Sequence, residues 1–280
     1  MQLRPRFPAP WFRHAATLGR RLWVSGGRRY HAVAGFSLAL VGVVPLVVVW
    51  FQPFALAAAL VLLFVVWAAA VAWNWVGVAG IREWGSSALL LGLSWFGTFA
   101  YWLFLENTFF RLAYLVVVGA VTWWYLDEWH LRRYGHDRRE AGAGPTPTLA
   151  HGYLAAYAFG SAADSFLVYL DTSLWLLLLT CYLPTVVIYL LAVRAYGVVG
   201  AKRTSLTLLG AVVLFQVFVI ATWWPTSFAV IGFTYATVFL ALVLVARQEQ
   251  QGYLNRRSFS RELAVLGTAQ VFVLALARWF

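Results

Sequence analysis

The amino-acid sequence predicts an all-α fold: a polytopic integral membrane helix bundle with about nine transmembrane helices, preceded by an N-terminal interfacial amphipathic helix. Three observations predict this class. Hydrophobic residues make up 62% of the 280 residues and charged residues only 11%, whereas soluble domains average about 45–50% and about 25%. The mean hydropathy is +0.76. Apolar runs recur along the chain, and most reach the roughly 20 residues that a helix needs to cross the hydrocarbon core.

The first region, residues 1–31, is a basic arm with seven arginines. Trp11, Ala15, Leu18 and Leu22 recur at helical spacing in this arm, and Arg13 lies among the residues of the opposite side. This pattern predicts an amphipathic helix that lies flat in the membrane interface. Because its polar side is cationic, we expect anionic lipids of the inner leaflet to be its partners.

The second region, residues 32–280, is the predicted transmembrane bundle. Its nine expected spans are residues 32–51, 54–80, 87–105, 108–126, 150–170, 172–193, 204–223, 226–246 and 263–279. The last is the shortest, so whether residues 263–279 cross the membrane is left open. The largest loop, 127–149, ends in the Gly/Pro-rich run "EAGAGPTPT", which is typical of a linker.

The positions of the basic residues predict the orientation. Alternate loops and the arm hold 19 of the 21 lysines and arginines, and only Arg111 and Arg278 fall on the opposite side. The positive-inside rule then places the N-terminus in the cytoplasm and, with nine spans, the C-terminus outside the cell membrane. The basic charge is explained by topology and lipid attraction, so we expect no nucleic-acid partner.

Sequence motifs for several kinds of chemistry are missing. The only lysine, Lys202, falls in a predicted loop, which argues against a retinal Schiff base. The chain has no glycine-rich phosphate loop and no HExxH motif. Cys181 is the only cysteine and has no thiol partner within the chain. We therefore name no catalytic residue and no metal ligand, expect no cofactor, and favour a non-enzymatic function.

One predicted span carries carboxylates. In "YLAAYAFGSAADSFLVYLD" (153–171), Tyr157, Ser161, Asp164 and Asp171 follow one another at helical spacing and share one face. Small residues fill the first half of this span, which predicts a central helix because small side chains let neighbouring helices approach closely. A charge inside a span costs about 2.5–3.5 kcal/mol on insertion and usually faces the bundle interior.

Arg111 is the expected cation for Asp164, because it lies at a similar depth in another span. Glu106, in the turn before Arg111, is a second possible partner of the guanidinium. In the functional interpretation, Glu106, Arg111, Asp164 and Asp171 line an outward-facing polar pocket, with Ser161 and Tyr157 on the same helix. In the structural interpretation, Arg111 and Asp164 form an interhelical clamp, and Asp171 and Asn107 or Thr108 cap the following helices.

Three functions are compatible with these residues. The first is a transporter-like or channel-like protein that handles a small solute, ion or lipid through the polar pocket. The second is a non-catalytic scaffold or subunit of a membrane or envelope complex that binds other membrane proteins. The third is a lipid-processing membrane enzyme, which lacks support because no nucleophile or acid–base arrangement accompanies the carboxylates. A water-accessible space at Asp164 would favour the first, and a dry, fully paired Asp164 the second.

Overall fold

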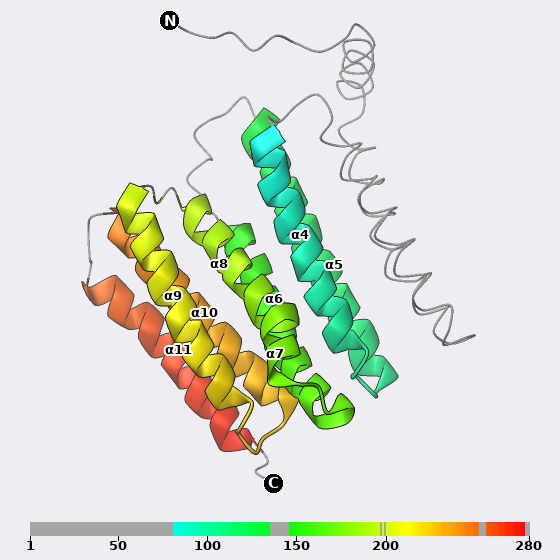
Figure 1. Ribbon diagram of the computed structural model, residues 1–280. Coiled ribbons are helices and arrows are strands. Elements are labelled where there is room, and N and C mark those ends of the chain that lie inside the picture. The colour runs from blue at the N-terminus through cyan, green and yellow to red at the C-terminus, as the bar shows by residue number, and fades with distance from the viewer. Residues whose placement is uncertain (1–80, 135–145, 197, 199, 252–255, 278–280) are drawn as a thin grey trace, which may run out of the picture. The chain divides into compact units, whose positions relative to one another are not determined.

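The computed structural model of the chain describes residues 81–134, 146–196, 198, 200–251 and 256–277 (Figure 1). These residues form helices and no strand. The predicted arm at residues 1–31 and the predicted spans 32–51 and 54–80 lie outside the described residues, as does the middle of the predicted loop, 135–145. Leu89–Phe280 form one compact unit of the chain.

The helices follow the apolar runs of the sequence. They are α4 (Ile81–Trp102), α5 (Thr108–Tyr134), α6 (Thr146–Leu170), α7 (Leu174–Leu177), the π-helix η1 (Leu178–Tyr182), α8 (Leu183–Ala195), α9 (Gly200–Ala221), α10 (Phe228–Gln251) and α11 (Arg256–Leu276). Within the described residues, three segments are long and apolar enough to cross a membrane: Leu174–Ala195, Gly200–Ala221 and Phe228–Glu249. An all-helical membrane protein is therefore supported, whereas the number of nine spans stays a prediction. Both α5 and α6 also extend into the predicted loop 127–149.

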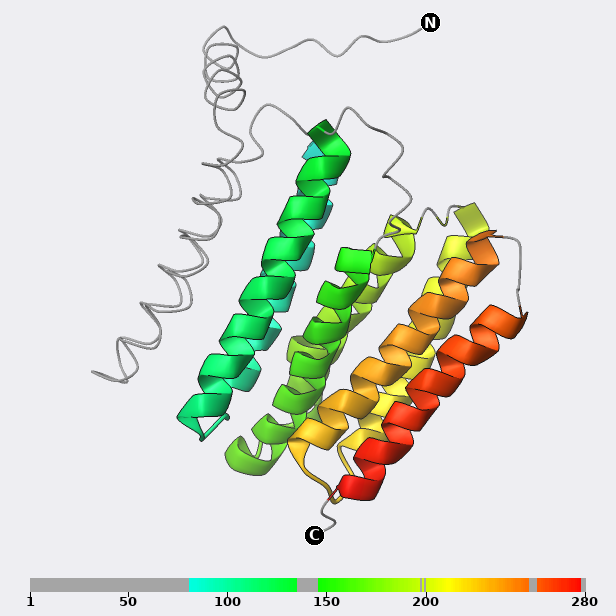
Figure 2. The same ribbon diagram turned by 180° about the vertical axis from the view of Figure 1, so that it is seen from behind.

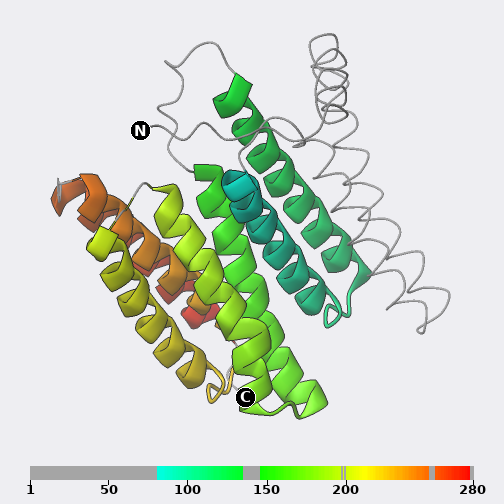
Figure 3. The same ribbon diagram turned by 45° about the horizontal axis from the view of Figure 1, so that its top comes forward.

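Helix α6 lies between the α4–α5 pair and the helices α8 to α10 (Figures 1 and 3). Its small residues Ala155, Ala158 and Ala162 have no exposed surface. The central position that the small residues predict for this helix is thus found in the structure. Since an alanine or glycine face has no long side chains to separate the helices, neighbouring backbones can pack directly against α6.

The closest packing is between α6 and α10. A Cβ atom placed on Gly160 would lie 3.1 Å from the Cα of Gly232 and 3.0 Å from the Cβ of Tyr235. A Cβ on Gly232 would overlap the hydroxyl oxygen of Ser161 and lie 2.6 Å from the carbonyl oxygen of Tyr157. Space therefore excludes a side chain at Gly232, whereas a Cβ at Gly160 would require its neighbours to shift by a few tenths of an ångström. This crossing sets how α10 lies along α6.

The segment after α6 contains a π-helical turn. The turn η1 ends just before Pro184, whose ring nitrogen has no hydrogen to donate to a helical carbonyl. Two threonines, one on each side of Pro184, bond back to the helix: the Thr180 hydroxyl donates to the carbonyl of Leu176 and the Thr185 hydroxyl to that of Cys181, at 2.8 and 2.9 Å.

The last helix, α11, packs along α10 on the side away from α6 (Figure 2). The side-chain amide of Gln270 donates a hydrogen bond of 2.6 Å to the hydroxyl of Thr234 on α10. Residues 263–276 are therefore part of the bundle, even though crossing of the membrane by this segment stays a prediction.

Because successive helices alternate in direction, the turns 103–107, 171–173 and 222–227 lie together at one end of the bundle (Figure 1). We call this the short-turn end.

Candidate functional site

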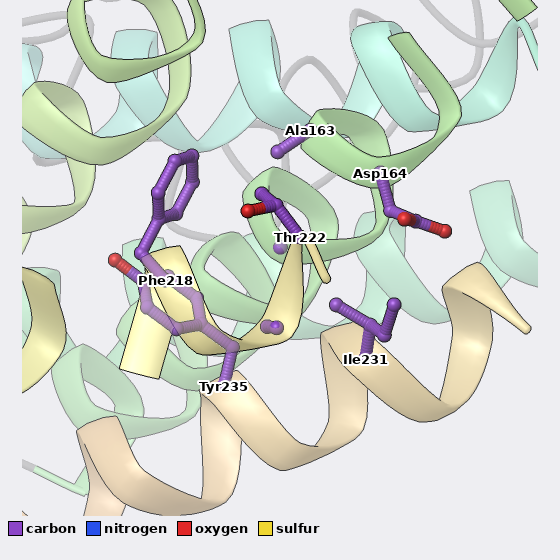
Figure 4. Close-up of a pocket in the computed structure, with 8 residues that line it drawn as sticks. Ala163, Asp164, Phe218, Thr222, Ile231 and Tyr235 are labelled. Carbon is purple, nitrogen blue, oxygen red and sulfur yellow. The ribbon is translucent and has the colours of Figure 1, made fainter. Parts of the chain in front are cut away.

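A small hollow lies near the short-turn end, where α6, α9 and α10 meet. It is lined by Gly160, Ala163, Asp164, Phe218, Ala221, Thr222, Ile231 and Tyr235. Its free space is about that of one water molecule. Figure 4 shows Asp164 and Ile231 on one side of the hollow, with Phe218 and Tyr235 on the other. Apart from Asp164 and the hydroxyls of Thr222 and Tyr235, the lining is apolar.

Asp164 is the only charged group at this hollow. It lies on α6, six residues before the helix ends at Leu170, which corresponds to about 9 Å along the axis. Its exposed fraction is 7%. Among the residues that the structure describes, none donates a hydrogen bond to the Asp164 carboxylate or forms an ion pair with it. The side chain therefore has neither full solvation nor a counter-charge from a described residue.

The polar groups around Asp164 bond elsewhere or have no partner. The Thr222 hydroxyl donates to the carbonyl of Val219 at 2.7 Å. The buried hydroxyls of Tyr235 and Ser161 make no hydrogen bond within the described part of the chain. Neither of these hydroxyls is placed at the Asp164 carboxyl group, because Ser161 does not line the hollow and Tyr235 lies across it from Asp164. The hollow therefore offers Asp164 as its one acidic group, and the residues that line it form neither a nucleophile–base pair nor a general acid–base pair.

The structure does not bring Arg111 to Asp164, so the expected ion pair is wrong. The Arg111 Nε donates to the carbonyl oxygen of Leu105, in the turn before α5. Its guanidinium carbon lies 5.4 Å from the centre of the Trp102 ring, at the end of α4. The physical reason is the direction of the side chain: matched depth allows contact, but Arg111 turns back onto its own helical hairpin.

The other two carboxylates also lie apart from the hollow. Glu106 and Asp171 are exposed in turns of the short-turn end, and neither forms an ion pair with a described residue. Asp171 has a φ of 47°, and the amide of Thr172 donates to the carbonyl of Phe166. Asp171 therefore ends α6 in the left-handed conformation that aspartate tolerates.

The expected caps are confirmed in one place and wrong in the other. At the start of α5, the Asn107 side-chain oxygen accepts a hydrogen bond of 2.8 Å from the amide of Phe109, as predicted for a capping residue. At the start of α7, Ser173 occupies the capping position and its side chain makes no capping hydrogen bond, so Asp171 is not the cap of α7.

Tyr157 belongs to a neighbouring aromatic cluster. Its hydroxyl lies 3.1 Å from that of Tyr101 on α4, and the two rings meet edge to face. The Tyr101 ring also contacts Tyr114 on α5 and Phe228 on α10. Of the six candidate residues, Ser161 and Asp164 lie at or beside the hollow, Tyr157 lies in this cluster, and Arg111, Glu106 and Asp171 lie in or next to turns.

Sequence reasoning missed the residues that α9 and α10 contribute to the hollow, chiefly Phe218, Thr222 and Tyr235. Their signal is weak, because aromatic and hydroxyl side chains occur throughout the apolar runs of this chain. Within the described residues there is also no group of three His, Cys, Asp or Glu side chains that could hold a metal ion.

Comparison with known proteins identifies no relative: no family model, no curated protein and no solved structure matches this chain. The class that the structure supports is therefore an all-helical protein with helices suited to a membrane.

Proposed function

We propose that this protein is a membrane transporter in which Asp164 binds a proton or a small cation, either as the transported ion or as the ion that drives movement of a small solute. The observation that carries this proposal is the state of Asp164: a carboxyl group, 7% exposed, with no hydrogen-bonding or charged partner among the described residues. Ionisable groups inside a membrane bundle commonly mark the path of an ion or substrate.

The physical argument concerns how the negative charge is neutralised. An unpaired carboxylate removed from water is unfavourable by several kcal/mol, so a buried acid binds either a proton or a cation. A permanent protein counter-charge would make Asp164 a structural clamp, and the expected one, Arg111, bonds to Leu105 instead. Because no described residue pairs with Asp164, we infer that what neutralises this carboxyl group is exchangeable. Its place about 9 Å from the end of α6 keeps the exchange path to water short.

The orientation and partners belong to the same proposal. With the N-terminus in the cytoplasm of a cell membrane, the short-turn end is external, and the hollow opens toward the outside. The basic arm, residues 1–31, holds the protein on anionic lipids of the inner leaflet.

A second function is favoured by a different observation. The hollow has space for about one water molecule, and the α6–α10 contact next to it is packed backbone to backbone. A space of this size suits an ion but not a larger solute. If Asp164 binds nothing exchangeable, the protein is better explained as a scaffold or subunit of a membrane complex.

Carbodiimide labelling of the purified full chain in lipid vesicles tests the proposal. Hydrophobic carbodiimides modify protonated carboxyl groups in apolar surroundings, and peptide mass spectrometry locates the label. We expect Asp164 to be labelled at mildly acidic pH, and labelling to fall at alkaline pH or on addition of the cation that competes for the site. Sodium, potassium and choline salts are the probes. Asp171, an exposed acid at the end of the same helix, is the internal control.

The same vesicles measure movement of the ion. A pH-sensitive dye inside them reports proton entry in response to imposed proton, sodium or potassium gradients, with Asp164→Asn as the inactive variant and Asp171→Asn as the matched control. Absence of carbodiimide labelling at every pH, together with equal fluxes for wild type and Asp164→Asn, would falsify the transporter proposal and favour the scaffold.

A further inference from the structure

A second charged group lies at the short-turn end, away from the hollow. Arg111 occupies the first turn of α5, and two contacts orient its side chain: the Nε–H bond to the carbonyl of Leu105 and the face of the Trp102 ring below the guanidinium. Together they place the guanidinium over the Trp102 ring, at the end of the α4–α5 hairpin. A side chain held in this way is ordered before any ligand arrives, which reduces the entropy cost of binding.

The charge of Arg111 has no counter-charge in the described chain. A guanidinium carries five N–H donors, and within the described residues only the one on Nε is used by a hydrogen bond. Glu106 lies nearby in sequence but is exposed and forms no ion pair with Arg111, and neither does Asp164 or Asp171. No described residue accepts from the four donors of the terminal nitrogens, whose fork geometry suits a phosphate group.

Trp102 supports the guanidinium from below. Its side chain is 2% exposed, and its ring lies beneath the guanidinium carbon of Arg111. Because the ring nitrogen is itself buried, an external ligand meets the guanidinium and not the ring N–H.

The surroundings of Arg111 indicate which kind of molecule carries the acceptor. The adjacent side chains on α5 are large, apolar and exposed: Phe109 by 72%, Phe110 by 60% and Leu112 by 47%. In a membrane protein such side chains face lipid, and an arginine among them at a helix end lies at the level of the headgroups. A ligand that contacts both the guanidinium and this apolar surface needs an anionic group joined to hydrocarbon.

We propose that Arg111, supported by Trp102, forms a binding site for the phosphate group of an anionic phospholipid at the short-turn end of the α4–α5 hairpin. The phosphate accepts hydrogen bonds from the terminal nitrogens of Arg111, and the acyl chains run along the part of α5 that follows, past the exposed Leu112. This site does not depend on the function proposed for Asp164 and would be retained in a scaffold.

Photo-crosslinking tests the site locally, which is needed because the chain has many other arginines. The full-length protein is reconstituted in vesicles that contain a trace of phosphatidylglycerol with a photoreactive group at the start of one acyl chain. Mass spectrometry then compares the labelled peptide that covers residues 103–114 with the peptide that covers Trp175 and Leu179, whose side chains are also exposed and apolar.

The expected result is labelling of the 103–114 peptide that excess unlabelled phosphatidylglycerol suppresses and excess phosphatidylcholine does not. Arg111→Gln should lower this labelling about tenfold, the factor that corresponds to losing one charge-assisted hydrogen bond, and leave the Trp175 peptide unchanged. Arg111→Lys keeps the charge and should retain part of the labelling. Unchanged size-exclusion behaviour shows that each variant is folded.

Three results would overturn the proposal. Labelling of residues 103–114 that does not depend on the headgroup would mean general contact with lipid. Equal labelling in wild type and Arg111→Gln would mean that the guanidinium binds no phosphate. Suppression by excess inorganic phosphate at constant ionic strength would mean that the ligand is a soluble anion and not a lipid.

Discussion

Replacement of Gly232 by alanine should destabilise the bundle, although the same replacement usually favours a helix. The added Cβ would overlap the Ser161 hydroxyl oxygen, lie 3.1 Å from the Ser161 Cβ and lie 2.6 Å from the carbonyl oxygen of Tyr157. Rotation of the Ser161 side chain can relieve the first contact. The carbonyl belongs to the α6 backbone, so it can be relieved only by moving α6 and α10 apart.

The magnitude follows from two opposing effects. Overpacking of a close contact costs about 1–3 kcal/mol, and removal of a helical glycine returns roughly 0.5–1 kcal/mol. We expect a net loss of about 1–2 kcal/mol. At about 2–4 °C per kcal/mol for a protein of this size class, the midpoint of thermal unfolding should fall by about 2–8 °C.

Thermal unfolding of the detergent-solubilised protein, followed by tryptophan fluorescence, measures this effect. Gly119→Ala and Gly267→Ala are the matched controls, because a Cβ at either position meets no atom within 4 Å. These variants should keep or gain stability. Ser161→Ala combined with Gly232→Ala should recover part of the loss, since one of the clashing atoms is gone. Equal behaviour of Gly232→Ala and Gly119→Ala would refute the close α6–α10 crossing.

Four other predictions can be tested with similar material. Asp164→Asn should keep or raise the thermal midpoint, because no protein partner is lost; a fall of about 3–5 kcal/mol in the free energy of unfolding would instead indicate a buried ion pair. Asp164→Asn and Arg111→Gln should be additive to within about 0.5 kcal/mol in a double-mutant cycle, since the residues do not touch, and clear coupling would contradict this arrangement. Gln270→Ala should lower the free energy of unfolding by about 0.5–1.5 kcal/mol, and the double variant with Thr234→Val should lose less than the sum of the two single variants, because both changes remove the same hydrogen bond and only Thr234→Val also removes the bond to the Val230 carbonyl. Reporter fusions should place the N-terminus in the cytoplasm, and an external N-terminus would reverse the proposed orientation.

The positions of the helices could be predicted from the sequence because the rule behind them is local. In an apolar environment each backbone N–H and C=O must bond within its own segment, so a long apolar run becomes a helix wherever it lies. The runs from residue 87 onward match the helices α4 to α11 to within a few residues at most ends. The observed ends differ from the predicted ones where polar residues continue a helix beyond its apolar part. Helix α5, for example, runs on to Tyr134.

The sequence also determined which helix is central. Residues such as Gly160 and Ser161 have little surface to bury against lipid, but their small size lets the backbone of another helix come close. The structure uses them in this way, with Gly160 against Gly232 and Ser161 against the same glycine. Here composition was sufficient, since small size acts in the same way whichever helix becomes the neighbour.

Only the tertiary structure decided what surrounds Asp164. Helical spacing tells which residues share a face of α6, but not which helix that face meets, and equal depth does not make two charges contact. Arg111 had a carbonyl and an aromatic ring within reach on its own hairpin, and it bonds to these. The residues that share the hollow with Asp164, among them Phe218, Thr222 and Tyr235, come from segments more than fifty residues later in the chain. How α10 lies along α6 depends on the glycine contact between the two helices, which is a property of the packed bundle and of no single segment.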